Sequence, residues 1–175
     1  QTAKIESERT IQMGNGNRGN IMIIKNGLVF TPEGKFEKKD LYVEGEYVAK
    51  ETTDNKEVEA EGCYVIPGLV DIHFHGCVRH DMCDGTEESI QALADYEAAN
   101  GVLAICPATM TIPEEELFQA MKAAKGHKNG KGADLVGINM EGPFINKEKK
   151  GAQKEEDIKL ADVELFHKLQ EAAGG

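Results

Sequence analysis

Apolar strand-like runs alternate with amphipathic helix-like segments after Pro67, and this alternation favours the α/β class over every other fold class. The runs lie at 69–75, 102–106 and 135–140, and the segments with helical spacing lie at 86–100, 111–124 and 162–173. Strand–helix repetition implies a parallel sheet covered by helices. At roughly 30 residues per βα unit, about three units fit into this stretch. If the sheet closes as an eight-unit barrel, which takes roughly 250 residues, the chain holds only part of it.

Helix-capping residues mark where the three helices should begin. Thr86 is a plausible N-cap, and Gly101 follows the end of the same helix. Thr111 precedes Glu114 by three residues, the spacing of a capping box. The third helix should begin at about Asp162. These signals predict helices over 86–100, from 111 onward, and over 162–173.

Residues 21–66 have the short apolar runs and turn residues of a small β module. Asn26-Gly27 between 21–25 and 28–31 is a strong hairpin signal, and Glu44-Gly45 is a weaker one. We expect a further strand pair from 57–60 and 63–66. A module of this size does not make a convincing domain alone, so we expect it to form part of a larger β structure.

Residues 1–20 differ from the rest of the chain and are expected to be an extension or linker. Residues 14–19 match the G-x-G-x-x-G dinucleotide pattern. That pattern needs a strand before it and a helix after it. Here no apolar run precedes it and a strand-like run follows, which favours the linker interpretation over a nucleotide site.

The composition argues against a nucleic-acid or membrane partner. The formal net charge is −11, whereas phosphate backbones are bound by clustered Lys and Arg. No apolar run has the length of a membrane span, and the first residues lack the apolar core of a secretory signal. The four cysteines form no CxxC pair, which favours free thiols in a reducing compartment. We therefore expect a cytoplasmic protein.

Two histidines lie at the end of the first strand-like run after Pro67. Side chains alternate across a strand, so Asp71, His73 and His75 share one face, and the apolar face toward the helices holds Val70, Ile72 and Phe74. Two imidazoles on one face can bind a divalent ion. They lie at the carboxyl end of the strand, where barrel active sites are built. The alternative is a pair of structural, hydrogen-bonded histidines.

Glu141 follows the third strand-like run and should lie at the same end of the sheet as His73 and His75. A carboxylate is an oxygen ligand for zinc or iron, and a catalytic metal needs about three protein ligands. His80, Cys77 and Cys83 lie in the loop after the His pair and are poorer candidates. The sequence therefore predicts a metal site formed by His73, His75 and Glu141.

With these residues the chain resembles the amidohydrolase superfamily, and within it the N-acetylglucosamine-6-phosphate deacetylase family. The His-x-His motif marks the superfamily, whereas Glu-Gly-Pro-Phe followed by Lys-Gly-Ala is specific to the deacetylase branch. The resemblance runs from about Ile21 to the last residue, and the motifs that carry it lie at 23–27, 67–76, 107–111, 141–144 and 149–153.

The resemblance implies a fold and a site. The fold would be a small β-sandwich, to which 21–66 contribute the N-terminal part, and a distorted (β/α)8 TIM-like barrel, to which 67–175 contribute the N-terminal part. Glu141 would be the main metal ligand, and His73 and His75 would complete a second position. The metal would be zinc or iron, as one or two ions per subunit. Ala152 and Gln153 would bind substrate, although many family members have His at the position of Gln153.

The resemblance also implies an activity and what it needs. The reaction would be deacetylation of N-acetylglucosamine 6-phosphate to glucosamine 6-phosphate and acetate in amino-sugar metabolism, by an enzyme that is a homodimer. Two further metal-binding histidines and the catalytic Asp would lie beyond Gly175. No catalytic residue is therefore expected within this chain, which by itself should not be a competent enzyme.

Two other functions remain compatible with the residues. The first is another amidohydrolase of the dihydroorotase or dipeptidase type, which would share the His pair but typically lack Glu-Gly-Pro-Phe. The second is a non-catalytic protein that retains a degenerate barrel and binds no stoichiometric metal. An assay of amino-sugar phosphate against cyclic amides separates the first from a deacetylase, and a metal analysis separates the second.

Overall fold

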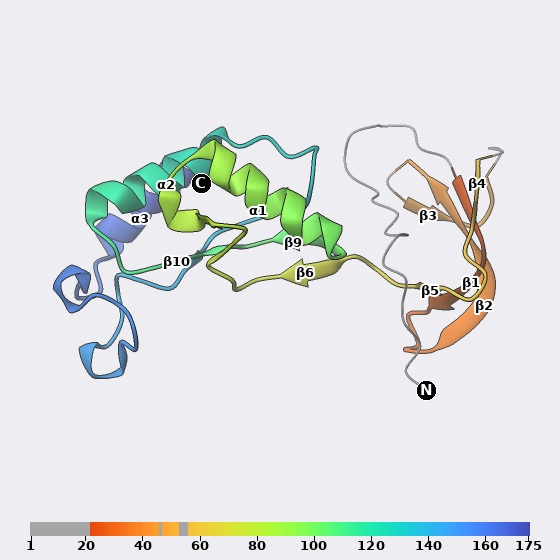
Figure 1. Cartoon of the computed structure of the whole chain (residues 1–175), viewed down its shortest axis with the longest axis horizontal. Helices are drawn as coiled ribbons and strands as arrows, with labels where there is room; N and C mark the ends of the chain where they lie inside the picture. Colours follow the sequence, from red (N-terminus) through yellow and green to blue (C-terminus); the bar gives the residue numbers. More distant parts are fainter. Residues whose placement is uncertain (1–21, 46, 53–55) are drawn as a thin grey trace. The chain divides into compact units, whose positions relative to one another are not determined.

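The computed structural model describes residues 22–45, 47–52 and 56–175, which divide into two compact units between Gly68 and Leu69 (Figure 1). The proposed linker 1–20 and its glycine-rich motif lie outside the described residues. Within the described part of the chain, no helix combines the length and the apolar character needed to cross a membrane.

The first unit is a mixed sheet built around one long strand. Strand β1 (Met22–Phe30) lies between antiparallel β2 (Phe36–Glu44) and two parallel strands, β4 (Glu57–Glu59) and β5 (Tyr64–Val65), while β3 (Tyr47–Ala49) pairs with β2. The buried apolar side chains of this unit are Met22, Val29, Val43 and Ala60. The predicted hairpin is confirmed as the antiparallel β2–β3 pair, but Glu44, expected in the turn, belongs to β2 and lies opposite Tyr47.

The hairpin predicted at Asn26-Gly27 is wrong, because β1 continues through both residues. Asn26 adopts a φ of 61°, and the register with β2 shifts between Ile24 and Gly27, so the two residues form a bulge instead of a turn. The Asn26 amide donates to Asp40 Oδ1 at 2.9 Å, and its side chain donates to the Glu59 carboxylate. The bulge is thus held from both neighbouring strands.

The pair expected between 57–60 and 63–66 is also wrong. Strands β4 and β5 lie in these segments, but each pairs in parallel with β1 and not with the other. Both segments lie along the same edge of β1, β4 opposite 23–25 and β5 opposite 28–29, so each pairs with a strand distant in sequence instead of with its neighbour.

The second unit has helices packed on parallel strands. Its order is β6 (Leu69–Asp71), α1 (Glu87–Ala99), β9 (Val102–Ile105), β10 (Ala108–Thr109), α2 (Glu114–Gly126), β11 (Asp134–Leu135), β12 (Asn139–Met140) and α3 (Val163–Ala173). The short elements between them are β7 (Gly76–Cys77), β8 (His80–Asp81) and the 3-10 helices η1 (Met82–Asp84), η2 (Lys147–Lys149) and η3 (Glu155–Asp157). Parallel pairs join β6, β9 and β11, and join β10 to β12. The predicted strand–helix alternation and parallel pairing are confirmed.

Helices α1 and α2 lie along one side of the strands, and their apolar residues form the core (Figure 1). Leu93 of α1 packs with Ile105 of β9, and Ile90 of α1 packs with Ala120 of α2. Leu117 and Met121 of α2 pack with Leu165 and Leu169 of α3. Helices at i, i+3 and i+4 spacing therefore bury one apolar face each, as the sequence pattern predicts.

Capping predicts two helix starts correctly and one wrongly. Thr86 accepts a hydrogen bond from the Ser89 amide at the start of α1, and Asp162 accepts one from the Leu165 amide at the start of α3. Thr111 caps no helix, because α2 begins at Glu114 after Pro113. A proline disfavours helical geometry in the residue before it, so a helix cannot readily run from Thr111 through Ile112.

The strands near the predicted site are shorter than expected. Strand β6 ends at Asp71, and the run 135–140 is split into β11 and β12. The prediction that Val70 and Ile72 face the helices is wrong, because their exposed fractions are 60% and 65%. Phe74 does pack against the α1 core.

Candidate metal centre

Backbone hydrogen bonds continue the sheet past the end of β6 and hold the segment that carries His73 and His75. The Cys106 amide donates to the Asp71 carbonyl at 2.8 Å, and the Ala108 amide donates to the Phe74 carbonyl at 2.6 Å. Pro107, between β9 and β10, is bound from the next segment, because the Asn139 amide donates to its carbonyl at 3.0 Å. The two histidines and Glu141 therefore emerge from neighbouring chain segments at the carboxyl ends of parallel strands.

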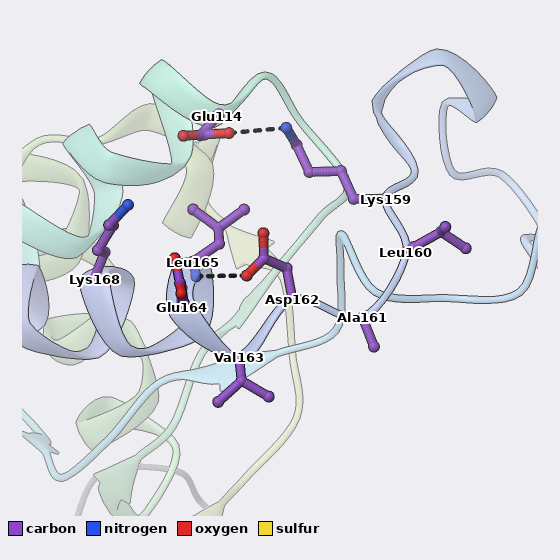
Figure 2. A pocket seen from close by; sticks show the side chains of 9 residues that line it. All are labelled: Glu114, Lys159, Leu160, Ala161, Asp162, Val163, Glu164, Leu165 and Lys168. Atoms are coloured by element: carbon purple, nitrogen blue, oxygen red, sulfur yellow. Dashed lines mark hydrogen bonds and ion pairs between the residues drawn. The ribbon is translucent and has the colours of Figure 1, made fainter.

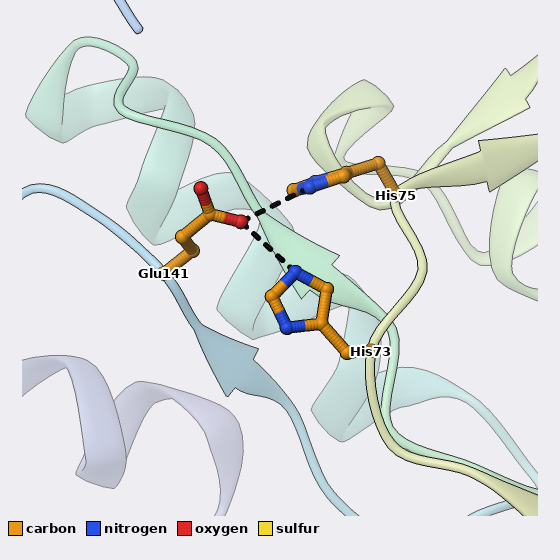
Figure 3. A group of neighbouring side chains, drawn as sticks. All are labelled: His73, His75 and Glu141. Carbon is orange, nitrogen blue, oxygen red and sulfur yellow. Dashed lines mark hydrogen bonds and ion pairs between the residues drawn. The ribbon is translucent and has the colours of Figure 1, made fainter. Parts of the chain in front are cut away.

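The side chains of His73, His75 and Glu141 converge on one point (Figure 3). Oε2 of Glu141 lies 3.0 Å from Nε2 of His73 and 3.0 Å from Nε2 of His75. The two imidazole rings are nearly perpendicular, with centroids 5.4 Å apart. About a third of the Glu141 side chain is exposed, so the cluster opens to solvent on one side.

The cluster favours an ionised Glu141. Burial raises the pKa of this carboxyl. The hydrogen bond from Gln153, the charge of His75, and the hydrogen bond and charge of His73 lower it by more, so the pKa lies below its usual value. Nδ1 of His75 is buried and has no hydrogen-bond partner among the described residues. The site therefore presents a carboxylate oxygen facing two imidazole nitrogens.

The donor set fits a divalent ion. The ligand atoms of the three residues all lie within 4.8 Å of one another, and they form the metal-ligand group found in the part of the chain that the structure describes. Two atoms bound to a zinc-like ion at about 2.1 Å lie about 3.0–3.4 Å apart for angles between square and tetrahedral. The 3.0 Å separations of Oε2 from the two Nε2 atoms fall at the short end of this range.

Asn139 also contacts the site, and the sequence reasoning missed it. Its amide nitrogen donates to the Ile72 carbonyl at 2.8 Å and lies 3.3 Å from Nδ1 of His73. The signal was present in the sequence, because residues 139 and 141 are two apart at a strand end and share a face.

The other residues considered from the sequence lie outside the cluster. His80 Nδ1 lies 3.1 Å from the Ser89 hydroxyl, and Cys83 Sγ accepts a hydrogen bond from the Met110 amide. Ala152 is exposed in the turn before Gln153. Gln153 itself is buried, and its amide donates to Glu141 Oε1 at 2.7 Å.

An open polar hollow lies at the start of α3, and none of the three cluster residues lines it (Figure 2). Lys159 forms an ion pair with Glu114 at 2.8 Å across this hollow, and Asp162 is engaged as the α3 N-cap. The ion pair joins the start of α2 to the segment before α3, and the Asp162 contact closes the first turn of α3. Among the described residues, those that line the hollow do not form a group that could hold a metal ion.

Comparison with known proteins finds relatives among deacetylases of amino-sugar phosphates. No family model matches the chain. N-acetylglucosamine-6-phosphate deacetylase of Bacillus subtilis (strain 168) is 33% identical over 159 residues, which cover 87% of this chain and 39% of that protein. The chain thus spans about two fifths of the length of this relative.

Solved structures of enzymes with the same name share the fold. That of Pasteurella multocida matches with a TM-score of 0.73 at 20% identity, over 88% of this chain and 42% of that one. That of a Mycobacterium smegmatis variant, in complex with N-acetyl-D-glucosamine-6-phosphate, matches with a TM-score of 0.72 at 19% identity, over 89% and 41%. Sequence and fold together confirm the resemblance drawn from the motifs and relate this chain to the N-acetylglucosamine-6-phosphate deacetylases.

Proposed function

We propose that the protein deacetylates N-acetylglucosamine 6-phosphate, and that this chain supplies part of the metal site for that reaction. The observation that carries the proposal is the convergence of His73, His75 and Glu141, with all ligand atoms within 4.8 Å, at the carboxyl ends of parallel strands. The names of the relatives and the sugar phosphate bound to one of the solved structures support the substrate.

The proposal assigns a role to each residue. Glu141 would hold the main metal, and His73 and His75 would hold or complete a second position. The ion is zinc or iron, both of which accept nitrogen and oxygen ligands. When bound, a divalent ion supplies Lewis-acid polarisation of the acetyl carbonyl. The further histidines and the Asp that moves the proton to the leaving amine are expected beyond Gly175.

The proposal extends to the fold. Residues 67–175 would be the first three βα units of a (β/α)8 barrel, and residues 21–66 would be part of a β-sandwich, with 1–20 as an extension or linker. The parallel β6–β9–β11 and β10–β12 pairs support the barrel, since barrel strands are parallel and their carboxyl ends carry the site. We further propose a homodimeric, cytoplasmic enzyme.

The test measures acetate release by a full-length protein that contains residues 1–175. We expect turnover of N-acetylglucosamine 6-phosphate and none of cyclic amides; the reverse preference would replace the proposal with a dihydroorotase-type activity. Glu141→Ala should lower both metal content and turnover. Loss of a hydrogen-bond partner of a metal ligand typically lowers metal affinity or activity about 10–100-fold. Loss of the ligand itself should therefore lower them by more than about 100-fold.

Two companion variants complete this test. His73→Ala combined with His75→Ala should reduce the metal content, because it removes both imidazoles from the cluster. Glu156→Ala removes an exposed carboxylate outside the cluster and should leave both metal content and turnover unchanged. Normal metal content and turnover in Glu141→Ala would refute the assignment of the site.

A further inference from the structure

Gln153 is held in the interior next to the metal-site cluster by the turn that precedes it. Its backbone amide donates to the Lys150 carbonyl at 3.0 Å, and the Lys150 ammonium donates back to the Gln153 carbonyl at 3.1 Å. Gly151 has a φ of 57°, as a turn with a left-handed first central residue requires. The turn leaves Ala152 exposed and directs Gln153 inward, where it is only 4% exposed.

The amide of Gln153 has one chemically consistent orientation. The backbone amide of Thr111 donates at 2.6 Å to Oε1 of Gln153, and a backbone N–H can only donate. Nε2 must therefore face the other way, where it donates to Oε1 of Glu141 at 2.7 Å. Its remaining N–H points to Sδ of Met110 at 3.7 Å. Both N–H groups of the amide thus have protein partners.

The hydrogen bond from Gln153 Nε2 gives the two oxygens of Glu141 different partners. Oε1 accepts from Gln153, and Oε2 is left to face Nε2 of His73 and His75. A carboxylate ligand turns about its last bonds unless an outer partner holds it, and such partners are part of what sets metal affinity. Gln153 is in turn fixed by Thr111, whose exposed fraction is 2%.

We propose that Gln153 is a positioning residue for the metal ligand Glu141: its buried amide fixes the carboxylate so that Oε2 points at the two histidines. This inference rests on the metal site of the proposed function. It differs from the substrate contact that the family resemblance implies for the same residue. A positioning residue changes metal affinity and kcat, whereas a sugar contact changes KM.

The test uses apo full-length protein titrated with Zn²⁺ and Co²⁺ against a competing chelator, together with the Co²⁺ absorption spectrum. Gln153→Met keeps the approximate volume of the side chain and removes both polar groups, so metal affinity should fall about 10–100-fold. Gln153→His should restore most of it, because a neutral imidazole has one donor and one acceptor nitrogen, as the Glu141 and Thr111 contacts require. KM for the amino-sugar phosphate should stay within about twofold of the wild-type value in both variants, because neither variant would remove a contact to the substrate.

Ser89→Ala is the matched structural control. Ser89 has the same exposed fraction, 4%, and also donates to a carboxylate, Asp84, but it lies outside the metal-site cluster. It should lower the unfolding temperature without changing metal affinity. If Gln153→Met does not fold, Gln153→Asn takes its place, because an amide one methylene shorter cannot reach both partners, and it should show the same loss of metal affinity.

Wild-type metal affinity in a folded Gln153→Met variant, with a raised KM, would overturn the inference and support the sugar contact instead. Failure of the proposed function is separable from this result. If the Gln153 variants lower metal affinity but the protein does not deacetylate the sugar phosphate, the positioning role stands and the proposed substrate is wrong. If the Glu141→Ala variant retains full metal affinity, both the proposed metal site and the positioning role of Gln153 are wrong.

Discussion

Gly142 lies between Glu141, the proposed metal ligand, and the buried Pro143, and its lack of a side chain lets Thr111 approach closely. A Cβ added at Gly142 would overlap Oγ1 of Thr111 and would lie 2.9 Å from its Cα and 3.0 Å from its Cβ. Carbon atoms in contact normally lie about 3.5–4.0 Å apart, so backbone or side chain must move by roughly 0.5 Å or more. The Gly142→Ala variant therefore tests how tightly Glu141 and Thr111 are packed together.

The size of the effect follows from two opposing contributions. Overpacking a well-packed interior typically costs about 1–3 kcal/mol. Replacing glycine with alanine also restricts the unfolded chain, which stabilises the native state by about 0.4–1 kcal/mol where the native backbone tolerates alanine. We expect Gly142→Ala to lower the free energy of unfolding by about 1–2 kcal/mol.

The same variant should disturb the site. The Thr111 amide holds Gln153, and Gln153 holds Glu141, so a displaced Thr111 is expected to loosen the carboxylate and weaken Zn²⁺ binding. Stability is measured by urea denaturation followed by far-UV circular dichroism, and metal affinity by chelator competition.

Gly137→Ala is the control for this measurement. A Cβ at Gly137 would meet only Sγ of Cys106, at 3.2 Å, which is the end of a side chain that can move. Its free energy of unfolding should change by less than about 0.5 kcal/mol. If Gly142→Ala is as stable as Gly137→Ala and binds Zn²⁺ as tightly as the wild type, the close packing of Glu141 against Thr111 is not a constraint on the site.

Two further predictions concern the core and the thiols. Leu169→Ala should lower the free energy of unfolding, measured by urea denaturation, by about 2–5 kcal/mol, because Leu169 is 1% exposed in the α2–α3 core. Leu160→Ala, at a side chain that is 91% exposed, should change it by less than about 0.5 kcal/mol. Equal effects of the two substitutions would contradict the burial of Leu169 between α2 and α3. Burial raises the pKa of the Cys83 thiol to about 11, so its reactive thiolate is scarce below that pH, and iodoacetamide at about pH 8 should label exposed Cys63 first when followed by peptide mass spectrometry. Labelling of Cys83 as fast as Cys63 in the folded protein would contradict its burial.

Local signals in the sequence were enough where the structure is decided by a few neighbouring residues. The alternation of strand and helix, the caps at Thr86 and Asp162, and the parallel pairing follow from periodicity and short-range hydrogen bonds. The grouping of His73, His75 and Glu141 could also be predicted, because the carboxyl ends of parallel strands meet at one edge of a sheet.

Only the tertiary structure decided features that depend on partners far along the chain. Asn26-Gly27 is a bulge and not a turn because Asp40 and Glu59, 14 and 33 residues away, bind Asn26. The structure alone shows that the amide of Gln153, a residue for which the resemblance implies a substrate contact, meets Glu141, 12 residues away, and Thr111, 42 residues away. A sequence records which side chains can donate or accept hydrogen bonds, but the fold determines which donor meets which acceptor, since that depends on packing between segments that no local pattern describes.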